Sequence, residues 1–137
     1  MLYYINEEKL DNGKVYNDYA KSVEKAISVL HNLNIFNFNL AIHTKDGLTG
    51  ILSEVLNNEI CKDLKNDNFS KYNLGTIGLI TEKIKPIYQY NTIIACFTSY
   101  NYLQKLIKSY PNNNIIYIPW TREELDLVSH DNNFNKI

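Results

Sequence analysis

Hydrophobic and polar positions follow one repeated pattern over residues 91–129. The apolar, β-branched runs Thr92–Phe97 and Ile115–Pro119 are each followed by a polar cluster and then by apolar positions at helical spacing. Strand, helix, strand and helix at these spacings predict a crossover unit whose two strands are parallel. Parallel strands end at the same edge of a sheet, so we expect the polar residues after these two strands to lie close together.

A third junction of this kind begins at the apolar run Phe38–Thr44. Apolar positions from Leu48 to Leu56 recur at helical spacing and predict a helix over 47–58. Asp46 is the expected N-cap of this helix, and the glycine after it allows a tight turn. If this strand is parallel to the other two, its polar residues join the same edge.

Two helix starts carry recognisable capping residues. Ser99 is a ready N-cap for a helix over 99–110, and Thr121 and Glu124 have the spacing of a capping box that begins the last helix. Near the amino end, a short strand is expected over 2–6. A turn at Asp11–Gly13 then leads into an amphipathic helix over 14–33.

The remaining segments have weaker patterns. Residues 59–74 are polar and poorly periodic, which predicts a loop with a turn or two of helix at most. Gly75–Thr81 predicts a strand, and the run Lys83–Tyr90 is interpreted either as a weaker edge strand that pairs with it antiparallel or as an extended loop. We therefore expect a single α/β domain over 1–130 and a polar tail over 131–137.

These elements predict a three-layer α/β sandwich, Rossmann-like or flavodoxin-like. The expected sheet is mixed but mostly parallel, has about five strands, and carries helices on both faces.

Composition narrows the class of protein. The 137 residues are 45% apolar with a net charge of −1, which is typical of one soluble globular domain. The chain has one arginine, Arg122, and no basic run longer than two residues, so a surface for duplex nucleic acid is not expected. It lacks a signal-peptide pattern and an apolar stretch long enough for a membrane span, so we expect a cytoplasmic protein without a membrane partner.

Chemical motifs are few. Cys61 and Cys96 have no zinc-like spacing, and the sequence contains no glycine-rich phosphate loop, no zinc-protease helix motif and no nucleophile elbow. We therefore expect no metal and no cofactor, and we expect binding in preference to catalysis.

The candidate site consists of the polar and aromatic residues after the three strands. Hydroxyls, cations and helix N-termini at the carboxyl edge of an open sheet favour an anionic ligand, and an aromatic ring can stack on a base. The candidate ligand-binding residues are His43, Thr44, Lys45, Asp46, Thr98, Ser99, Tyr100, Trp120, Thr121 and Arg122.

Three functions fit this pattern. The first is a non-enzymatic protein that binds a nucleotide-like anion. The chain is rich in amino acids that have AT-rich codons. One concrete form of this first function is therefore a phage or mobile-element sponge that sequesters a nucleotide signal. The second is a protein–protein module, such as an inhibitor or an assembly subunit, or a homo-oligomer, because tyrosine and tryptophan favour interfaces. The third is a nucleotide hydrolase or transferase that uses His43 and Asp46.

Overall fold

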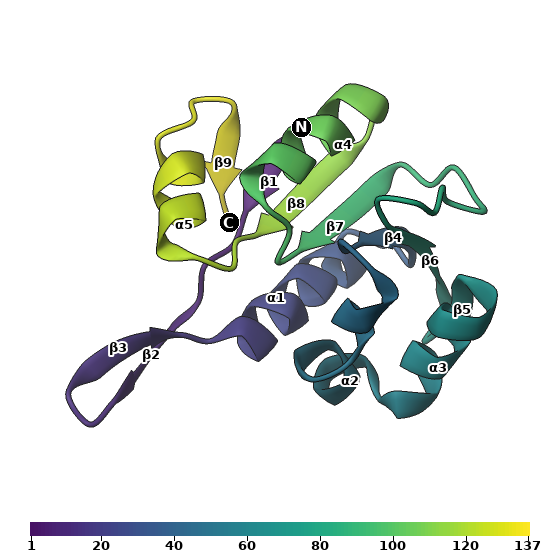
Figure 1. Cartoon of the computed structure of the whole chain (residues 1–137), viewed down its shortest axis with the longest axis horizontal. Helices are drawn as coiled ribbons and strands as arrows, with labels where there is room; N and C mark the ends of the chain where they lie inside the picture. The colour runs from purple at the N-terminus through teal and green to yellow at the C-terminus, as the bar shows by residue number, and fades with distance from the viewer.

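The computed structural model describes all residues, 1–137, and contains a seven-stranded sheet between two layers of helices (Figure 1). The strands of this sheet are β1 (Leu2–Tyr4), β4 (Asn37–Ala41), β5 (Phe69–Tyr72), β6 (Gly75–Ile80), β7 (Thr92–Cys96), β8 (Asn114–Ile118) and β9 (Phe134–Lys136). The helices are α1 (Tyr19–Asn32), α2 (Ile51–Leu56), α3 (Asn58–Asp67), α4 (Tyr100–Ser109) and α5 (Arg122–Ser129), with a 3-10 turn η1 (Lys45–Leu48). A separate hairpin of β2 (Glu8–Asp11) and β3 (Lys14–Asn17) projects from the body.

The sheet has the strand order β5-β6-β4-β7-β8-β1-β9. All neighbouring pairs are parallel except β5 and β6. One buried cluster joins the sheet to α1, α2 and α3, and a second joins its other face to α4 and α5. The predicted three-layer, mostly parallel α/β fold is therefore confirmed, with seven strands instead of about five.

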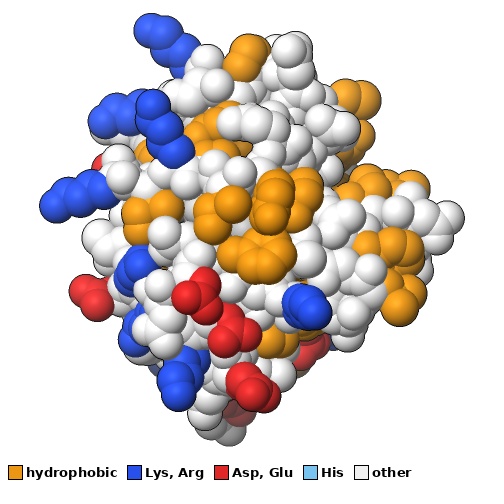
Figure 2. Space-filling model, turned by 90° about the vertical axis from the view of Figure 1, so that its right-hand side faces the viewer, with side chains coloured by type: hydrophobic (Ala, Val, Ile, Leu, Met, Phe, Trp, Pro, Cys, Tyr) orange, Lys and Arg blue, Asp and Glu red, His pale blue; other side chains and the backbone are white.

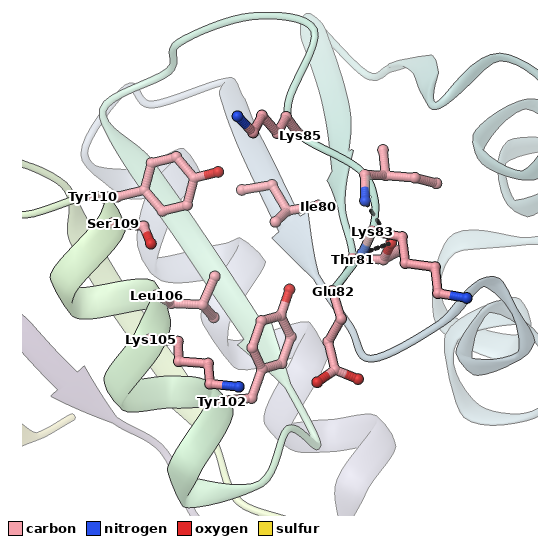
Figure 3. Close-up of a pocket in the computed structure, with 11 residues that line it drawn as sticks. Ile80, Thr81, Glu82, Lys83, Lys85, Tyr102, Lys105, Leu106, Ser109 and Tyr110 are labelled. Carbon is pink, nitrogen blue, oxygen red and sulfur yellow. Dashed lines mark hydrogen bonds between the residues drawn. The ribbon is translucent and has the colours of Figure 1, made fainter.

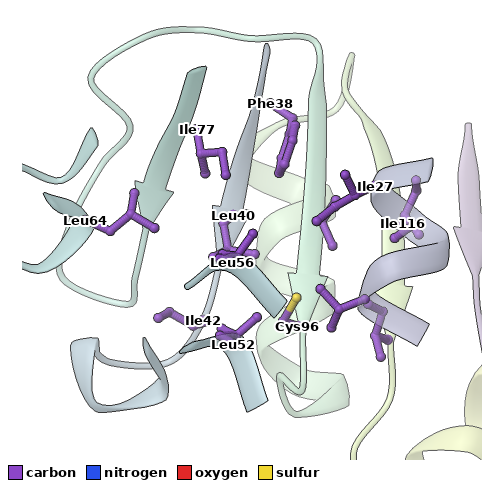
Figure 4. Close-up of a cluster of buried hydrophobic side chains, with 14 of the residues drawn as sticks. Ile27, Phe38, Leu40, Ile42, Leu52, Leu56, Leu64, Ile77, Cys96 and Ile116 are labelled. Carbon is purple, nitrogen blue, oxygen red and sulfur yellow. The ribbon is translucent and has the colours of Figure 1, made fainter. Parts of the chain in front are cut away.

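The central strands are apolar on both faces. In β7, Ile94 and Cys96 belong to the cluster under α1–α3, and Ile93 and Ala95 belong to the cluster under α4 and α5 (Figure 4). Successive side chains of a strand point to opposite faces, so a strand covered by helices on both sides has to be apolar throughout. This explains why β7 and β8 are short continuous apolar runs.

The winding of the chain reverses between β4 and β7. From β4 the chain passes through α2 and α3 to β6, on one side of β4. From β7 it passes through α4 to β8, on the other side and over the opposite face. The order β6-β4-β7-β8 is that of the first four strands of a flavodoxin-like sheet, and β1 occupies the position of the fifth strand.

The helix expected over 47–58 and the loop expected over 59–74 are both corrected. Gly50 and Asn57 have positive φ values of 69° and 79°, and these left-handed residues divide the segment into η1, α2 and α3. The Asn57 side chain accepts a hydrogen bond from the Ile60 N–H and caps α3. Residues 59–74 thus contain most of α3 and all of β5. The sequence pattern did not indicate α3 because only Cys61 and Leu64 form its buried face.

The helix expected over 14–33 begins later. Residues 14–17 pair with 8–11 across the turn at Asn12-Gly13, and Asp18 caps α1 by accepting a hydrogen bond from the Lys21 N–H at 3.1 Å. Asn-Gly between two extended runs is a strong hairpin signal. It outweighs the helical periodicity of the residues that follow it.

The antiparallel edge exists, but its strand is β5 and not Lys83–Tyr90. That run crosses from β6 to β7 without regular structure. The buried Asn39 side chain donates a hydrogen bond to the Tyr88 carbonyl at 3.0 Å and holds this crossover against β4. A Cβ on Gly78, the neighbour of Asn39 in β6, would lie 2.1 Å from the Asn39 Oδ1, so only glycine leaves room for this contact.

The side of the molecule that carries β5, β6 and the 81–91 crossover exposes a hydrophobic patch. Figure 2 shows hydrophobic side chains at the centre of this face, with lysines along its upper left margin and acidic side chains below. The most exposed large hydrophobic side chains of these elements are Leu74, Ile87 and Tyr88, and Tyr88 packs against Phe69 and Tyr90.

The polar tail expected over 131–137 is also corrected, since it contains β9. This strand pairs in parallel with β1, and Phe134 is buried with the α4 and α5 cluster. None of the helices combines the length and the apolar character needed to cross a bilayer.

Replacing Phe134 tests whether β9 is part of the folded core. We expect Phe134→Ala to lower the free energy of unfolding by about 3 kcal/mol, because a buried aromatic ring is lost and a cavity remains. Asn135→Ala, at the exposed neighbouring position, is the control and should change it by less than about 0.5 kcal/mol. Urea unfolding followed by circular dichroism measures both, and equal effects would contradict the role of β9.

Candidate functional site

The three predicted junctions lie at one edge of the sheet. Strands β4, β7 and β8 are parallel neighbours, so the residues after Ala41, Cys96 and Ile118 meet at their carboxyl ends. The reversal of winding between β4 and β7 places the crevice in which open α/β sheets bind ligands at the first two of these junctions.

His43 fills this crevice. The Ser99 N–H donates a hydrogen bond to His43 Nε2 at 2.8 Å, which leaves Nδ1 to donate to Glu82 Oε2 at 3.2 Å. The Glu82 N–H in turn donates to the His43 carbonyl at 3.2 Å, and the imidazole packs against the Tyr102 ring. The side chain therefore connects three segments, which are the end of β4, the start of α4 and the segment after β6.

The neighbours of His43 on the β4 junction point to different partners. The Lys45 ammonium donates to the Lys65 carbonyl near the end of α3, so it caps that helix. Asp46 was the expected N-cap but lies inside η1, whose cap position is Thr44. No ion pair joins Asp46 to His43, because Glu82 is the carboxylate that meets the imidazole.

The β7 junction is tightly bound to the protein itself. Thr98 is fully buried, its carbonyl accepts a hydrogen bond from the Tyr117 hydroxyl at 2.7 Å, and its own hydroxyl has no partner. The Ser99 side chain caps α4 by accepting from the Tyr102 N–H at 3.1 Å, as predicted. Tyr100 points to the far end of the chain, where its hydroxyl donates to Asp131 at 2.7 Å.

The β8 junction carries an aromatic cluster. Trp120 stacks on Tyr19 with ring centroids 4.5 Å apart, and Phe97 meets both rings edge-on. Phe97 has a φ of 58°, an uncommon backbone conformation for a residue with a bulky side chain. The predicted capping box of Thr121 and Glu124 is present.

Arg122 is not part of a pocket. Its side chain is 78% exposed and pairs with Asp126 one turn along α5 at 3.2 Å. The structure therefore brings His43 and Ser99 together. Tyr100 bonds to Asp131 instead, and Arg122 is exposed. Trp120 and Phe97 line a hollow of about 360 Å³ with residues of η1 and α2.

Further open space lies beside this edge, around the segment 81–85. Two hollows share Thr81–Ile84 as a common wall. One, of about 260 Å³, is lined by that wall and by His43, Thr44 and Lys45. The other, of about 240 Å³, lies between the wall and α4. Three predicted residues thus line the first of these two hollows, and the second is formed by residues that the sequence pattern did not indicate.

The second hollow combines cations with hydroxyls over an apolar floor (Figure 3). The hydroxyls of Tyr102 and Tyr110 point into it, and Ile80 lies between them. Lys85 extends over the opening, whereas Lys83 points away. The remaining residues around it include Lys105, Leu106, Ser109 and Glu82.

Tyr102 is the most informative of these residues. It is 6% exposed, and its hydroxyl is buried without any hydrogen-bond partner. Burial, together with the nearby Glu82 carboxylate, raises the pKa of this hydroxyl, and burial also raises the pKa of Tyr110. Both tyrosines are therefore neutral hydrogen-bond donors at physiological pH. An unpartnered buried hydroxyl costs about 1–3 kcal/mol, which an acceptor in the hollow would offset.

Sequence reasoning missed Tyr102, Lys85 and Lys105 because their roles depend on packing. Tyr102 lies on the apolar face of α4, so its position indicates a core residue. Lys105 lies on the exposed face of the same helix, so its position indicates a solvent-facing residue. The absence of a helix between β6 and β7 leaves the hollow open, and that feature is visible in the sequence only as a weakly patterned run with Pro86.

Comparison with protein-family models, with curated protein sequences and with solved structures found no match. By its fold the molecule is an α/β protein with a doubly wound sheet. Its two hollows around the segment 81–85 lie beside the carboxyl edge of this sheet.

Replacing Tyr100 tests its link to Asp131. The Tyr100 hydroxyl and the Asn133 backbone N–H hold the pKa of Asp131 below its usual value, while burial and Asp131 raise the pKa of Tyr100 to about 12. A lowered carboxyl pKa stabilises the fold only while the group is ionised. The contribution is present at pH 7 and is lost as the pH falls below about 4.

We expect Tyr100→Phe to lower the free energy of unfolding by about 1 kcal/mol at pH 7, since solvent screens this partly exposed pair, and by clearly less at pH 3. Urea unfolding at both pH values measures the difference. Tyr110→Phe, whose hydroxyl makes no hydrogen bond, should show no such pH dependence. An effect of Tyr100→Phe that is the same at both pH values would refute the link.

Proposed function

We propose that the protein binds a small anionic ligand, of the nucleotide class, in the hollow between α4 and the 81–85 segment. The observation that carries this proposal is the buried Tyr102 hydroxyl, which has no partner and points into a space bordered by lysines. A neutral donor and nearby ammonium groups suit phosphate or carboxylate oxygens.

The composition of the site favours an anion that also has a ring. The cations Lys85 and Lys105 exceed the single carboxylate of Glu82, so the lining is positive. The floor of Ile80 and Leu106 suits an apolar or aromatic part of the ligand.

Binding is favoured over catalysis by the state of His43. A general base needs a free ring nitrogen within reach of the substrate. In this structure Nε2 accepts from the Ser99 N–H and Nδ1 lies against Glu82, so both nitrogens are engaged. We propose that His43 positions the wall of the site and that hydrolysis through His43 and Asp46 is the weaker alternative.

A ligand panel tests the proposal. We expect nucleoside mono-, di- and triphosphates, compared with the parent nucleosides, to raise the melting temperature of the wild-type protein in proportion to their affinity. Unchanged melting temperatures across the whole phosphate series would remove the proposal. Recovery of every ligand chemically unchanged after long incubation would separate binding from turnover.

The site residues predict a distinctive pair of effects for Tyr102→Phe. Removal of the unpartnered hydroxyl should leave the free protein as stable as wild type or more stable by about 1 kcal/mol. The same variant should bind the stabilising ligand roughly tenfold more weakly, because one hydrogen bond to an anion is lost. Isothermal titration calorimetry and urea unfolding measure the two effects.

Lysine variants locate the ligand along α4. Lys105→Gln and Lys85→Gln should each weaken binding, whereas Lys108→Gln, on the same helix but outside the hollow, should not. Equal losses for Lys105 and Lys108 would indicate only a general charge effect, and would contradict the assigned site.

A second candidate function is protein docking through the hydrophobic patch of Figure 2. The exposed Leu74, Ile87 and Tyr88 side chains favour it, because contiguous exposed apolar groups mark interaction surfaces. Ile87→Lys would abolish partner binding without altering the thermal response to nucleotides, whereas Tyr102→Phe would do the reverse.

A further inference from the structure

The β2–β3 hairpin does not pair with the seven-stranded sheet. It forms a two-stranded sheet of its own and projects away from the body (Figure 1). All four residues of β2 are exposed, and the apolar pair of Leu10 and Val15, which lie opposite each other, is 73% and 63% exposed. A hairpin with both edges free is marginally stable in water, and additional strands stabilise it.

The turn determines which backbone groups face outward. Asn12 and Gly13 have φ values of 51° and 76°, as a two-residue type I′ turn requires. Asp11 and Lys14 flank this turn and therefore form the hydrogen-bonded pair that closes it. Because pairing alternates along an antiparallel ladder, the N–H and C=O of Leu10 lie on the free outer edge of β2.

We propose that two copies of this chain associate by pairing β2 with β2, antiparallel and centred on Leu10, to form one four-stranded sheet. This register uses the outward N–H and C=O of each Leu10 in a reciprocal pair, as a two-fold axis through that pair requires. It rests on the hairpin alone and is independent of the ligand site.

Charge complementarity selects this register. With Leu10 opposite Leu10, the Lys9 of each copy lies opposite the Asp11 of the other, so this contact forms twice by symmetry. Within each hairpin Asp11 is already opposite Lys14, so each carboxylate lies between two ammonium groups. A centre on Lys9 would oppose two lysines, and a centre between Lys9 and Leu10 would oppose Glu8 and Asp11.

The apolar side chains also become continuous in this register. Leu10 and Val15 share a face, so the four strands present the row Val15, Leu10, Leu10, Val15. Each exposed apolar pair gains a neighbour of the same kind. The contact comprises only two short hairpins, which is small for a stable dimer, so we expect a concentration-dependent association.

Two proline variants distinguish the two edges of the hairpin. Proline at position 10 removes an outward N–H and leaves the bonds within the hairpin intact, so Leu10→Pro should abolish the dimer. Val15→Pro makes the same change on the outer edge of β3 and should leave the dimer in place. Sedimentation velocity over roughly micromolar to millimolar protein measures both, and slow amide exchange at Lys9 and Lys14 reports that the hairpin is still formed.

Charge inversion provides the second arm of the experiment. Lys9→Asp places like charges opposite each other and should weaken association at least tenfold. The combined variant Lys9→Asp, Asp11→Lys, Lys14→Asp inverts every member of the row and should restore it. A wild-type protein that remains monomeric throughout, loss of the dimer in Val15→Pro, or no recovery in the combined variant would each overturn the proposed pairing.

Discussion

The central strands have to be covered on both faces, and most of the architecture follows from this constraint. Strands β7 and β8 are apolar on both sides, so the chain has to place helices above and below them. It does so by reversing its winding between β4 and β7. The reversal opens a crevice where these strands end, and His43 closes it by accepting the Ser99 N–H. The imidazole thus connects the segments that follow β4 and β7, the two neighbouring strands between which the winding reverses.

Next to the crevice that His43 closes, a hollow remains open between α4 and the segment 81–85. The chain returns from β6 to β7 without a helix, so α4 has only an extended segment facing it on that side. Lysines on this segment and on α4 then border a buried tyrosine hydroxyl. The same polar segment is connected to His43 through Glu82, so the proposed site and the closed crevice share one structural support.

Much of the fold could be predicted because parallel strands and capped helices leave local patterns. The crossover unit from β7 to β8 and the caps at Ser99 and Thr121 are correct. Errors occur where a single residue decides the backbone path, as with Asn57, or where a distant strand supplies the partner, as with Phe134 and β1. The three predicted junctions meet at one edge of the sheet, but their polar residues bond largely to the protein itself. Tyr102 was missed because a helix stripe does not reveal which hydroxyl lacks a partner.

The position of β1 has a consequence for the order in which the molecule can assemble. Strand β1 precedes every other strand along the chain, yet its neighbours in the sheet are β8 and β9. The amino-terminal strand therefore stays without its neighbours during most of translation. Strand β1 has both of its neighbours only after β9 has been synthesised, whereas β4, β6 and β7, which pair with one another, are complete earlier along the chain.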